Sequence, residues 1–500
     1  MSAPANRRIN VMLVTVDQWP GNLLGVAGHP VAQTPTLDQL ARNAVRYTRA
    51  YSECPICIPA RRTLMTGTAT RTHGDRVFGT TTPMPDHLPT LAQCFRDAGY
   101  QAYAVGKLHV YPPRDRIGFD DVALAEEGRP HLGAVDDYDI FLAEQGFVGQ
   151  QFAGGMNNNN YMHRPWHLPE SCHATNWLTQ AMCRTIKRRD PKRPAFWYLS
   201  YNHPHPPLAP LSHYMEFYRQ FEPPAALEAA WSRDPEELPF TLKMCRNYWR
   251  TLPAPALREA RRAFYALCTH IDHQFRLVLG TLREEGLLDD TAIFFTADHG
   301  EMLGDFGLYA KRLFYEGSSG IPCMLMGPLG DPRTLPGTVD ARLVDLADVM
   351  PTLLDLAHLP VPGTVEGLPM LGTERREILC GDCLENNGAT RMAHDGRHKL
   401  IWYPAGNRVQ IFDLAADPTE LQDLAADPAH RAIRARLSAA LVQAAWGTDH
   451  EKGWVQGGVL TGFDPGPYVP FPDRSWSGQR GLHFPPPPAL AEDKMVGFPQ

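Results

Sequence analysis

The sequence predicts an α/β protein in which helices cover both faces of a sheet, followed by a small α+β domain. Three observations support this prediction. Short apolar segments typical of buried strands alternate with amphipathic segments of helical spacing. Near residue 370 the alternation gives way to short strands separated by turns. Residues 451–500 are rich in proline and aromatic side chains. We therefore expect three segments, 1–370, 371–450 and 451–500.

The individual elements follow from periodicity and from turn signals. The main strands are expected at 9–16, 101–106, 194–201 and 291–297. The helices are expected at 36–46, 91–98, 177–188, 257–285 and 430–446. The small domain adds short antiparallel strands at about 376–382, 399–404 and 409–414. In the last segment, four aromatic side chains favour an arm packed on the body or on a neighbouring subunit, namely Tyr468, Phe471, Trp476 and Phe484. A disordered tail is the alternative for this proline-rich stretch.

Composition narrows the class of protein. The 500 residues are 43% hydrophobic and 21% charged, with a net charge of −7, which is typical of a large globular chain. No basic block is present, so a nucleic-acid partner is not expected. No apolar run reaches the roughly 18 residues of a membrane-spanning helix, so no membrane association is expected. The ten cysteines are irregularly spaced, which predicts reduced thiols and a cytoplasmic protein.

One stretch, CPICIPARRTLMTG at residues 54–67, has several interpretations. The C-x-x-C spacing fits a redox pair, or half of a zinc site completed by Cys380 and Cys383. Two buried structural thiols are the simplest alternative. Pro59, however, suits the first turn of a helix, which places Cys57 at a helix N-terminus that attracts anions. Arg61 follows four residues later, on the same side of that helix.

The order of these residues resembles a known signature. Cys57–Arg61, followed by Leu64–Gly67, is similar to the C-x-P-x-R…L-x-T-G pattern of the type I sulfatases, which belong to the alkaline-phosphatase superfamily. This resemblance implies a large mixed, mostly parallel sheet sandwiched by helices. It also implies that a formylglycine-generating maturation enzyme converts Cys57 into Cα-formylglycine.

Two further segments suggest a metal site. Asp17 and Gln18 end the first predicted strand, and Asp298 and His299 end the late one. Adjacent parallel strands would bring these ends together around one divalent cation. Both segments resemble the metal-binding segments of the sulfatases, which implies a site completed by residue 57. Calcium is the usual metal of the family. Gln18 and His299 replace the more common Asp and Asn, a nitrogen-containing set that also suits Mn²⁺, and Mg²⁺ is a further possibility.

The resemblance extends to the sulfate site. The segment GKLH after the strand at 101–106 matches a family segment that supplies a lysine and a histidine, here Lys107 and His109. In YNHPHPP, His205 corresponds to the leaving-group histidine, with His203 ranked second. Lys311 corresponds to a second lysine of the sulfate site.

This resemblance implies a mechanism. A hydroxyl of the hydrated formylglycine at position 57 attacks sulfur and displaces an alcohol or phenol. The charge of the sulfuryl group is neutralised by the metal and by three side chains, those of Arg61, Lys107 and Lys311. His205, together with Lys311, protonates the leaving oxygen. His109 takes the proton of the second hydroxyl, so that the hemiacetal sulfate collapses and regenerates the aldehyde.

Two other functions stay open, as does the leaving group. The Asp-Gln and Asp-His pairs also resemble the phosphonate monoester hydrolases, which use the same nucleophile, but Lys107 and His109 favour a sulfatase. An inactive relative that binds a metal or a sulfated ligand is the non-enzyme alternative. The segment at about 115–169, with Tyr138 and Trp166, is expected to shape the pocket for a small aryl, sugar or quaternary ammonium ester. The aromatic arm leaves a homo-oligomer possible.

Overall fold

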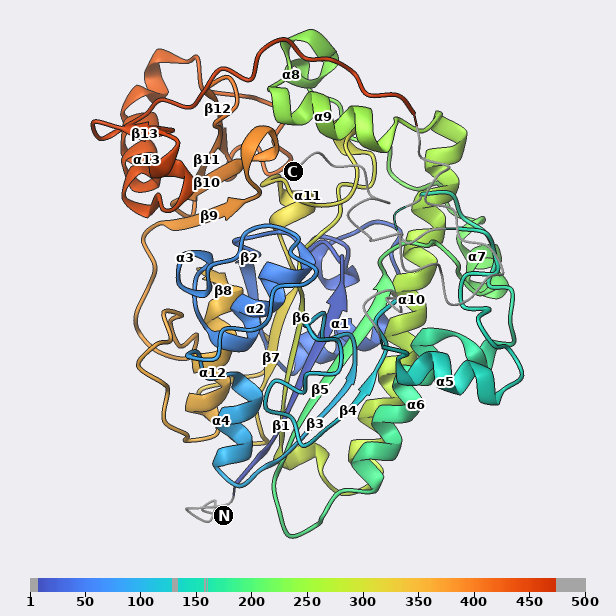
Figure 1. Ribbon diagram of the computed structural model, residues 1–500. Coiled ribbons are helices and arrows are strands. Elements are labelled where there is room, and N and C mark those ends of the chain that lie inside the picture. Colours follow the sequence, from blue (N-terminus) through green and yellow to red (C-terminus); the bar gives the residue numbers. More distant parts are fainter. Residues whose placement is uncertain (1–7, 128–133, 157–158, 160, 474–500) are drawn as a thin grey trace.

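The computed structural model describes residues 8–127, 134–156, 159 and 161–473. An eight-stranded sheet forms the centre, in the order β4-β3-β5-β1-β6-β7-β2-β8. Its strands run parallel except β7, which is antiparallel to both of its neighbours. Helices α1, α6 and α10 cover one face, whereas α2, α4 and α12 cover the other (Figure 1). The predicted mixed, mostly parallel sheet between helices is confirmed.

The described elements have the following bounds. The strands of the large sheet are β1 (Asn10–Asp17), β2 (Val45–Tyr51), β3 (Gln101–Gly106), β4 (Asp121–Leu124), β5 (Ala195–Pro204), β6 (Thr291–Ala297), β7 (Cys323–Met326) and β8 (Thr338–Asp345). The helices up to the end of that sheet are α1 (Pro35–Arg42), α2 (Cys57–Thr66), α3 (Thr70–His73), α4 (Leu91–Asp97), α5 (Asp137–Glu144), α6 (Ala174–Lys187), α7 (Ser212–Tyr218), α8 (Ala230–Arg233), α9 (Phe240–Trp249), α10 (Ala254–Glu284), α11 (Glu316–Ser319) and α12 (Val349–Leu356). The C-terminal elements are β9 (Leu379–Cys383), β10 (Thr390–His394), β11 (His398–Tyr403), β12 (Arg408–Asp413), α13 (Arg431–Ala444), α14 (Thr448–Glu451), β13 (Val455–Gln456) and β14 (Val459–Leu460).

The centre of the sheet explains where polar side chains gather. Every residue of β1 is buried, as expected for a strand with helices on both of its faces. Strand β1 pairs in parallel with β6 so that Val16 lies opposite Ala297, and with β5 on its other side. The next residues, Asp17 and Asp298, therefore leave the sheet side by side. The expected meeting of these two strand ends is confirmed.

Several boundaries differ from the sequence-based expectation. The helix expected at 36–46 ends at Arg42, because residues 45–51 form β2, which pairs with β7 and β8. The strand expected at 194–201 continues to Pro204 and carries His203 on its end. Strands β4, β7, β8 and β10 were not expected, because they are short or lack a regular alternation of apolar residues.

The C-terminal domain contains an antiparallel sheet in the order β12-β11-β10-β9, with α13 against it. A buried ion pair joins it to the large domain, because Lys399 Nζ on β11 lies 2.6 Å from Glu316 Oε1 on α11. Lys399 is fully buried, and Glu420 Oε1 also lies 2.6 Å from its Nζ. Because α11 follows the segment that carries Lys311, this contact fixes the small domain beside that segment. The division of the chain at residues 370 and 450 stays a prediction.

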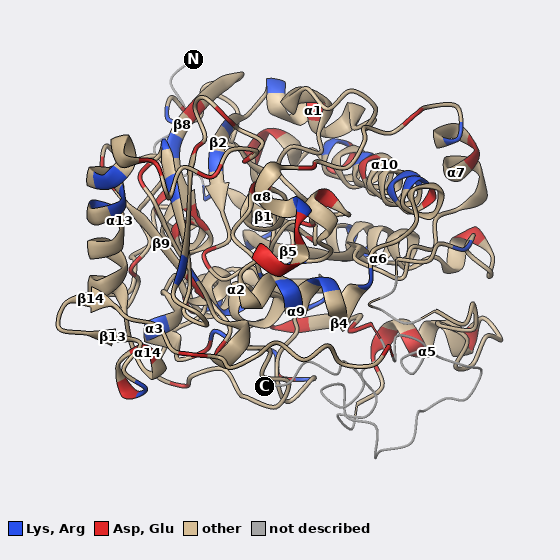
Figure 2. Ribbon diagram, turned by 90° about the horizontal axis from the view of Figure 1, so that it is seen from above, with Lys and Arg blue, Asp and Glu red and all other residues tan. Residues whose placement is uncertain are grey.

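The described part of the C-terminal arm lies along α9 (Figure 1). Asn247 Oδ1 accepts hydrogen bonds from Tyr468 Oη at 2.9 Å and from the backbone amide of Phe471 at 2.8 Å. Trp476 and Phe484 lie outside the described residues. Over the molecule as a whole, acidic and basic segments are interspersed (Figure 2).

An unpaired acid lies at the junction of the two domains. Glu53 is 4% exposed, and neither carboxyl oxygen has a hydrogen-bonding partner among the described residues. It lines a cavity between the large sheet and the C-terminal domain, together with Asp345 and Asp382. Burial, reinforced by the Asp345 carboxylate, raises the pKa of Glu53 to about 8. Glu53 therefore stays protonated in the folded protein at neutral pH.

We expect Glu53→Gln to make stability less dependent on pH. Between pH 4.5 and 8 the unfolded chain releases this proton while the folded protein retains it, so the wild type loses stability as pH rises. The difference in Tm between the variant and the wild type should grow from near zero at pH 5 to a gain of several degrees at pH 9, measured by scanning calorimetry. Glu377→Gln, at an exposed acid of the same cavity, is the matched control. A constant difference in Tm across this range would contradict the assignment.

Candidate active site

The site is built around the N-terminus of α2. Ile56 is extended, with φ −151°, and the helix begins at Cys57. It ends at Gly67, whose φ of 65° lies in the left-handed region that favours glycine. All ten residues of α2 are buried, and Cys57 is only 2% exposed. The helix therefore presents its first residue to the interior of the protein at the carboxyl edge of the sheet.

Four of the five predicted metal ligands lie together. One ligand atom from each of Asp17, Cys57, Asp298 and His299 falls within 4.8 Å of the others. His299 Nε2 lies 3.1 Å from Cys57 Sγ, 3.7 Å from Asp17 Oδ1 and 3.6 Å from Asp298 Oδ1. Both carboxylates are fully buried.

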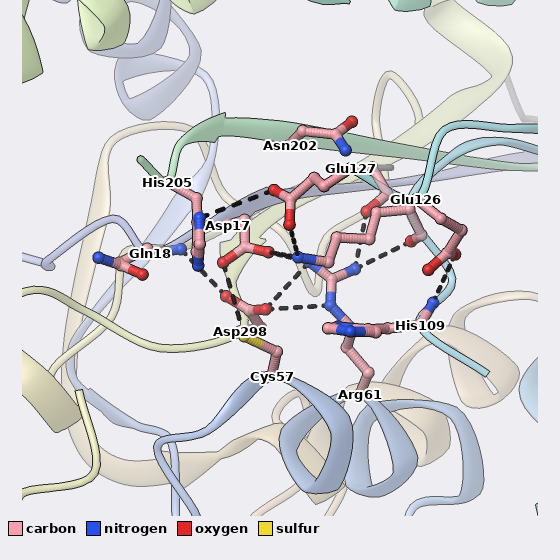
Figure 3. Close-up of polar contacts among 12 residues, drawn as sticks. Asp17, Gln18, Cys57, Arg61, His109, Glu126, Glu127, Asn202, His205 and Asp298 are labelled. Carbon is pink, nitrogen blue, oxygen red and sulfur yellow. Dashed lines mark hydrogen bonds and ion pairs between the residues drawn. The ribbon is translucent and has the colours of Figure 1, made fainter. Parts of the chain in front are cut away.

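Arg61 connects the two carboxylates to the sheet (Figure 3). Its guanidinium lies 3.3 Å from Asp17 Oδ2 and donates to Asp298 Oδ2 at 3.0 Å. Its Nη1 also donates to two hydroxyl groups of β5, those of Tyr198 and Ser200. Arg61 is 3% exposed, so its charge and those of the two acids compensate one another inside the protein.

Lys107 lies between two acids. Its Nζ donates to Asp17 Oδ2 at 2.6 Å and to Glu127 Oε2 at 2.7 Å. Burial alone would raise the pKa of Asp17, but Lys107 and the neighbouring cations outweigh it and hold that pKa well below the usual value. For Glu127 burial prevails and raises the pKa to about 7. Lys107 itself remains protonated, because its two acidic partners offset the burial that would lower its pKa.

Two further predicted residues adjoin this cluster. His205 Nδ1 lies 3.8 Å from Glu127 Oε1 and donates to the carbonyl of Pro206 at 2.7 Å. Burial, together with the charge of Lys311, lowers the pKa of His205 well below the usual value. Lys311 Nζ donates to Gln18 Oε1 at 2.7 Å. The His205 ring and the Lys311 cation thus lie on the same edge of the sheet as Asp17.

Gln18, the fifth predicted ligand, has a network of its own. Its backbone amide donates to Asp298 Oδ1 at 3.1 Å. Its side-chain NH₂ donates to Glu301, a residue whose carboxylate also accepts from Tyr161 at 2.5 Å. The amide oxygen of Gln18 accepts from Lys311. In this structure, therefore, the Gln18 side chain is held between Lys311 and Glu301.

His109 is placed by its backbone. Glu126 Oε1 accepts hydrogen bonds from the amides of Leu108 and His109, at 2.8 and 2.7 Å. The residue has a φ of 61°, and its ring meets the Phe78 ring edge-on with centroids 5.4 Å apart. The ring of His203, the second-ranked histidine, lies instead against that of His173 in a tilted arrangement, with centroids 4.9 Å apart.

Sequence reasoning missed the partners of the predicted residues. These are Glu126, Glu127, Tyr161, Tyr198, Ser200 and Glu301. Ser200 and Tyr198 lie in an apolar strand, so no motif distinguishes them. The consecutive acids Glu126 and Glu127 directly after β4 were the one available signal, because acids that follow a parallel strand lie at the functional edge of the sheet.

The cysteine alternatives receive no support. In the described part of the chain, the only group of His, Cys, Asp and Glu atoms arranged for a metal is the one that includes Cys57. The thiol of Cys54 lies 3.9 Å from the carbonyl oxygen of Arg76, and that of Cys380 lies 3.9 Å from the carbonyl oxygen of Ala440. Among the described residues the four cysteines do not form a group of metal-ligand atoms, so the four-cysteine zinc site is not supported.

Together, a buried group of carboxylates and imidazole beside three cations, at the carboxyl edge of this sheet, defines a hydrolase of the alkaline-phosphatase superfamily. A model of the sulfatase family matches residues 9–359, and a model described as N-sulphoglucosamine sulphohydrolase, C-terminal, matches residues 304–446. The chain belongs to the sulfatase family and hydrolyses sulfuric esters.

Curated relatives cover most of the chain. An arylsulfatase of Clostridium perfringens is 32% identical over 473 residues, which cover 90% of this chain and 97% of that protein. A choline-sulfatase of Rhizobium meliloti is 30% identical over 435 residues, covering 82% of this chain and 81% of that protein. Among solved structures, a phosphonate monoester hydrolase of Agrobacterium radiobacter shares the fold with a TM-score of 0.76 and 23% identity, covering 87% and 95% of the two chains. No helix in the described ranges is both long and apolar enough to cross a membrane.

Proposed function

We propose that the protein hydrolyses the sulfate monoester of a small aryl or alkyl alcohol, with formylglycine at position 57 as the nucleophile. The observation that carries this proposal is the convergence on Asp17 of Cys57 and Arg61, both from α2, and of Lys107, which follows β3. The arylsulfatase and choline-sulfatase relatives support a small leaving group.

We propose that Asp17, Gln18, Asp298 and His299, with residue 57, hold one divalent cation. The donor atoms fit such an ion, because two buried carboxylates face an imidazole nitrogen. A neutral His299 ring that donates Nδ1–H to the carbonyl of Gly300, at 3.0 Å, directs the Nε2 lone pair toward them. The ion, when bound, would polarise the sulfate ester and lower the pKa of the nucleophile. Calcium is the first candidate, with Mn²⁺ or Mg²⁺ as alternatives.

The protein's own side chains would then take these roles. Arg61 and Lys107 would neutralise the charge of the sulfuryl oxygens, and both are already held in place by Asp17. Lys311, held by Gln18, would bind the oxygen that joins sulfur to the leaving group. His205 would act on the departing oxygen through Nε2, since its Nδ1–H is bonded to Pro206. The neutral ring carries no proton on Nε2, so Nε2 would first have to gain one, which the negative charge of the bound ester would favour, before passing it to that oxygen. His109 would accept the proton of the second hydroxyl at residue 57.

A pair of matched esters tests the reaction class. We expect kcat/KM for 4-nitrophenyl sulfate to exceed that for 4-nitrophenyl phenylphosphonate by at least about 100-fold, because Lys107 and Arg61 suit a sulfuryl group. The same protein carrying formylglycine serves for both substrates. A higher kcat/KM for the phosphonate would instead support the second candidate function, that of a phosphonate monoester hydrolase. We consider this candidate because the chain shares its fold with such an enzyme. Turnover of neither ester would point to an inactive binding relative.

Removal of the metal should abolish activity. Without a cation, the buried Asp17 and Asp298 carboxylates face residue 57 and oppose an anionic nucleophile. We expect treatment with EDTA followed by gel filtration to lower kcat for 4-nitrophenyl sulfate by more than about 100-fold. Re-addition of calcium should restore it. Recovery with Mn²⁺ or Mg²⁺ alone would correct the choice of metal, and full activity with no metal detected by mass spectrometry would refute the site.

The remaining sequence-based expectations become proposals. We propose maturation of Cys57 by a formylglycine-generating enzyme, because the C-x-P-x-R pattern stands at the start of α2. A cytoplasmic location is supported by ten free thiols. Self-association through residues 451–500 is the corresponding proposal for the arm.

A further inference from the structure

A pocket adjoins the sulfate site at Glu127. Its wall includes Glu127, Asn202 and His203, with the rings of Tyr138 and Trp166. Glu127 belongs to both regions, because its Oε2 accepts from Lys107 while its Oε1 lies 3.8 Å from His205 Nδ1. A leaving group whose oxygen meets His205 would therefore extend into this pocket.

The pocket offers hydrogen-bond acceptors that lack donors. Asn202 is 4% exposed, and its Nδ2 donates to the carbonyl of Ala125 at 2.9 Å. That bond fixes the amide orientation, since a carbonyl can only accept. The other end of the amide, Oδ1, has no hydrogen-bonding partner in the described structure. Gln151 Oε1, on the same wall, also has none. An unsatisfied buried acceptor is unfavourable by about 1–3 kcal/mol, so a ligand that brings a donor would be favoured.

The pocket contains an acidic side chain but no basic one of the lysine or arginine type. Among the described residues that line it, Glu127 is the one carboxylate, and none is lysine or arginine. Lys107 neutralises Glu127 from its other oxygen, on the sulfate side. A leaving group with its own carboxylate or second sulfate would meet acceptors and no cation. Figure 3 shows Glu127 and Asn202 on the same side of His205.

Tyr138 and Trp166 form an apolar, aromatic part of the pocket wall. The Tyr138 hydroxyl donates to the carbonyl of Cys172 at 2.7 Å, and Trp166 Nε1 donates to that of Pro169 at 3.1 Å. Because their polar atoms are already bonded, both residues contribute apolar ring surface to the pocket. Such a wall suits an aryl or short alkyl group that carries its polar substituent at the far end.

We propose that the leaving group carries a hydrogen-bond donor, best a protonated primary amine, which Asn202 and Glu127 recognise, and that anionic leaving groups are disfavoured. This inference rests on the proposed function, because it places the sulfate of the same ester between Arg61 and Lys107. It distinguishes an amine-bearing or hydroxyl-bearing substrate from a polysulfated or uronate-containing one.

Four aryl sulfates with an alkyl spacer test the inference, since the spacer keeps the acidity of the phenol nearly constant. They are 4-(2-aminoethyl)phenyl sulfate, 4-(2-hydroxyethyl)phenyl sulfate, 4-ethylphenyl sulfate and 3-(4-sulfooxyphenyl)propanoate. We expect kcat/KM to fall in that order. The amine should exceed the ethyl compound by about 10- to 100-fold, in keeping with a hydrogen bond to a charged group. Equal values, or a preference for the propanoate, would overturn the inference.

Substitutions in the pocket test which residues cause the preference for the amine substrate. Asn202→Leu removes the unpaired acceptor at similar volume and should lower the ratio of amine to ethyl substrate by about 10-fold. Glu127→Gln should lower the same ratio, and because the ratio compares two substrates of one variant, any general loss through Lys107 cancels. Gln39→Leu, at an exposed amide on α1, is the control and should leave the ratio unchanged. An unchanged ratio in both pocket variants would refute their role.

Measurements of binding test the pocket assignment independently of the proposed reaction. Isothermal titration of the same esters into Cys57→Ala measures affinity without turnover, and Kd should rise in the order amine, hydroxyl, ethyl, propanoate. If 4-nitrophenyl sulfate is not hydrolysed by the wild type, the proposed function fails, whereas this order of Kd values would still support the pocket assignment. If 4-nitrophenyl sulfate is hydrolysed but Kd and kcat/KM show no preference, only the pocket assignment fails.

Discussion

Replacing Cys57 by alanine is expected to lower kcat/KM for 4-nitrophenyl sulfate by at least about 10³-fold, to the level of the uncatalysed reaction within detection. Cys57 is the one residue of the buried group Asp17, Cys57, Asp298 and His299 that we propose becomes an aldehyde. Alanine removes the nucleophile but leaves Arg61 and Lys107 paired with Asp17. Circular dichroism and calorimetry should therefore find a folded protein of nearly unchanged Tm.

Cys57→Ser sharpens this prediction. Serine can attack sulfur once but has no second hydroxyl, so its sulfate ester cannot collapse to an aldehyde. We expect at most one equivalent of 4-nitrophenol per protein, and mass spectrometry should find one sulfuryl group on the peptide that contains residue 57. Steady turnover by the serine variant, or an unmodified thiol in fully active wild type, would exclude a formylglycine mechanism.

Removing Arg61 is expected to damage both activity and stability. Arg61→Ala leaves the buried Asp17 and Asp298 carboxylates without their shared cation, and breaking a buried pair in this way costs about 3–5 kcal/mol. It also removes one of the charges that we propose neutralise the sulfuryl oxygens, which should lower kcat by about 10²- to 10³-fold. Urea unfolding and steady-state kinetics measure the two effects separately.

Two further variants separate the loss of activity from the loss of stability. Arg61→Lys keeps the charge but loses the bonds that Nη1 makes to Tyr198 and Ser200, so most of the stability should return but little of the activity. Ser200→Ala removes one of those acceptors alone and should cost less than about 1.5 kcal/mol. An added divalent cation should stabilise Arg61→Ala more than the wild type, because it compensates the same two carboxylates. Equal stabilisation of both proteins would argue against a metal beside Asp17.

The sequence predicted those parts of the fold that depend on strong local patterns. Strands β3 and β6 were predicted to the residue, because their apolar runs end abruptly at polar side chains. Strand β2 was not predicted, and its first two residues were assigned to the end of a helix, because its pairing with β7 and β8 involves residues almost 300 positions away. Long-range pairing of this kind leaves little signal in the neighbouring residues.

The same contrast applies to the site. Asp17, Cys57 and Asp298 stand at strand or helix ends within recognisable motifs, and Arg61 follows Cys57 by about one helical turn, so their convergence could be expected. Glu127, in contrast, is placed by a left-handed backbone with φ 58° and by its bond to Lys107, neither of which a sequence pattern encodes. Ser200 contacts Arg61 from within an otherwise apolar strand. Such partners become visible only when the tertiary structure is known.

The burial of α2 has a consequence for the proposed maturation of Cys57. Residues 57–61, which the proposed maturation enzyme would have to bind, lie in a helix whose side chains are all inside the folded protein. Such an enzyme would not reach these side chains in the folded protein. Under that proposal, oxidation of Cys57 would have to precede folding of the large domain, and a chain that folded first would keep its thiol.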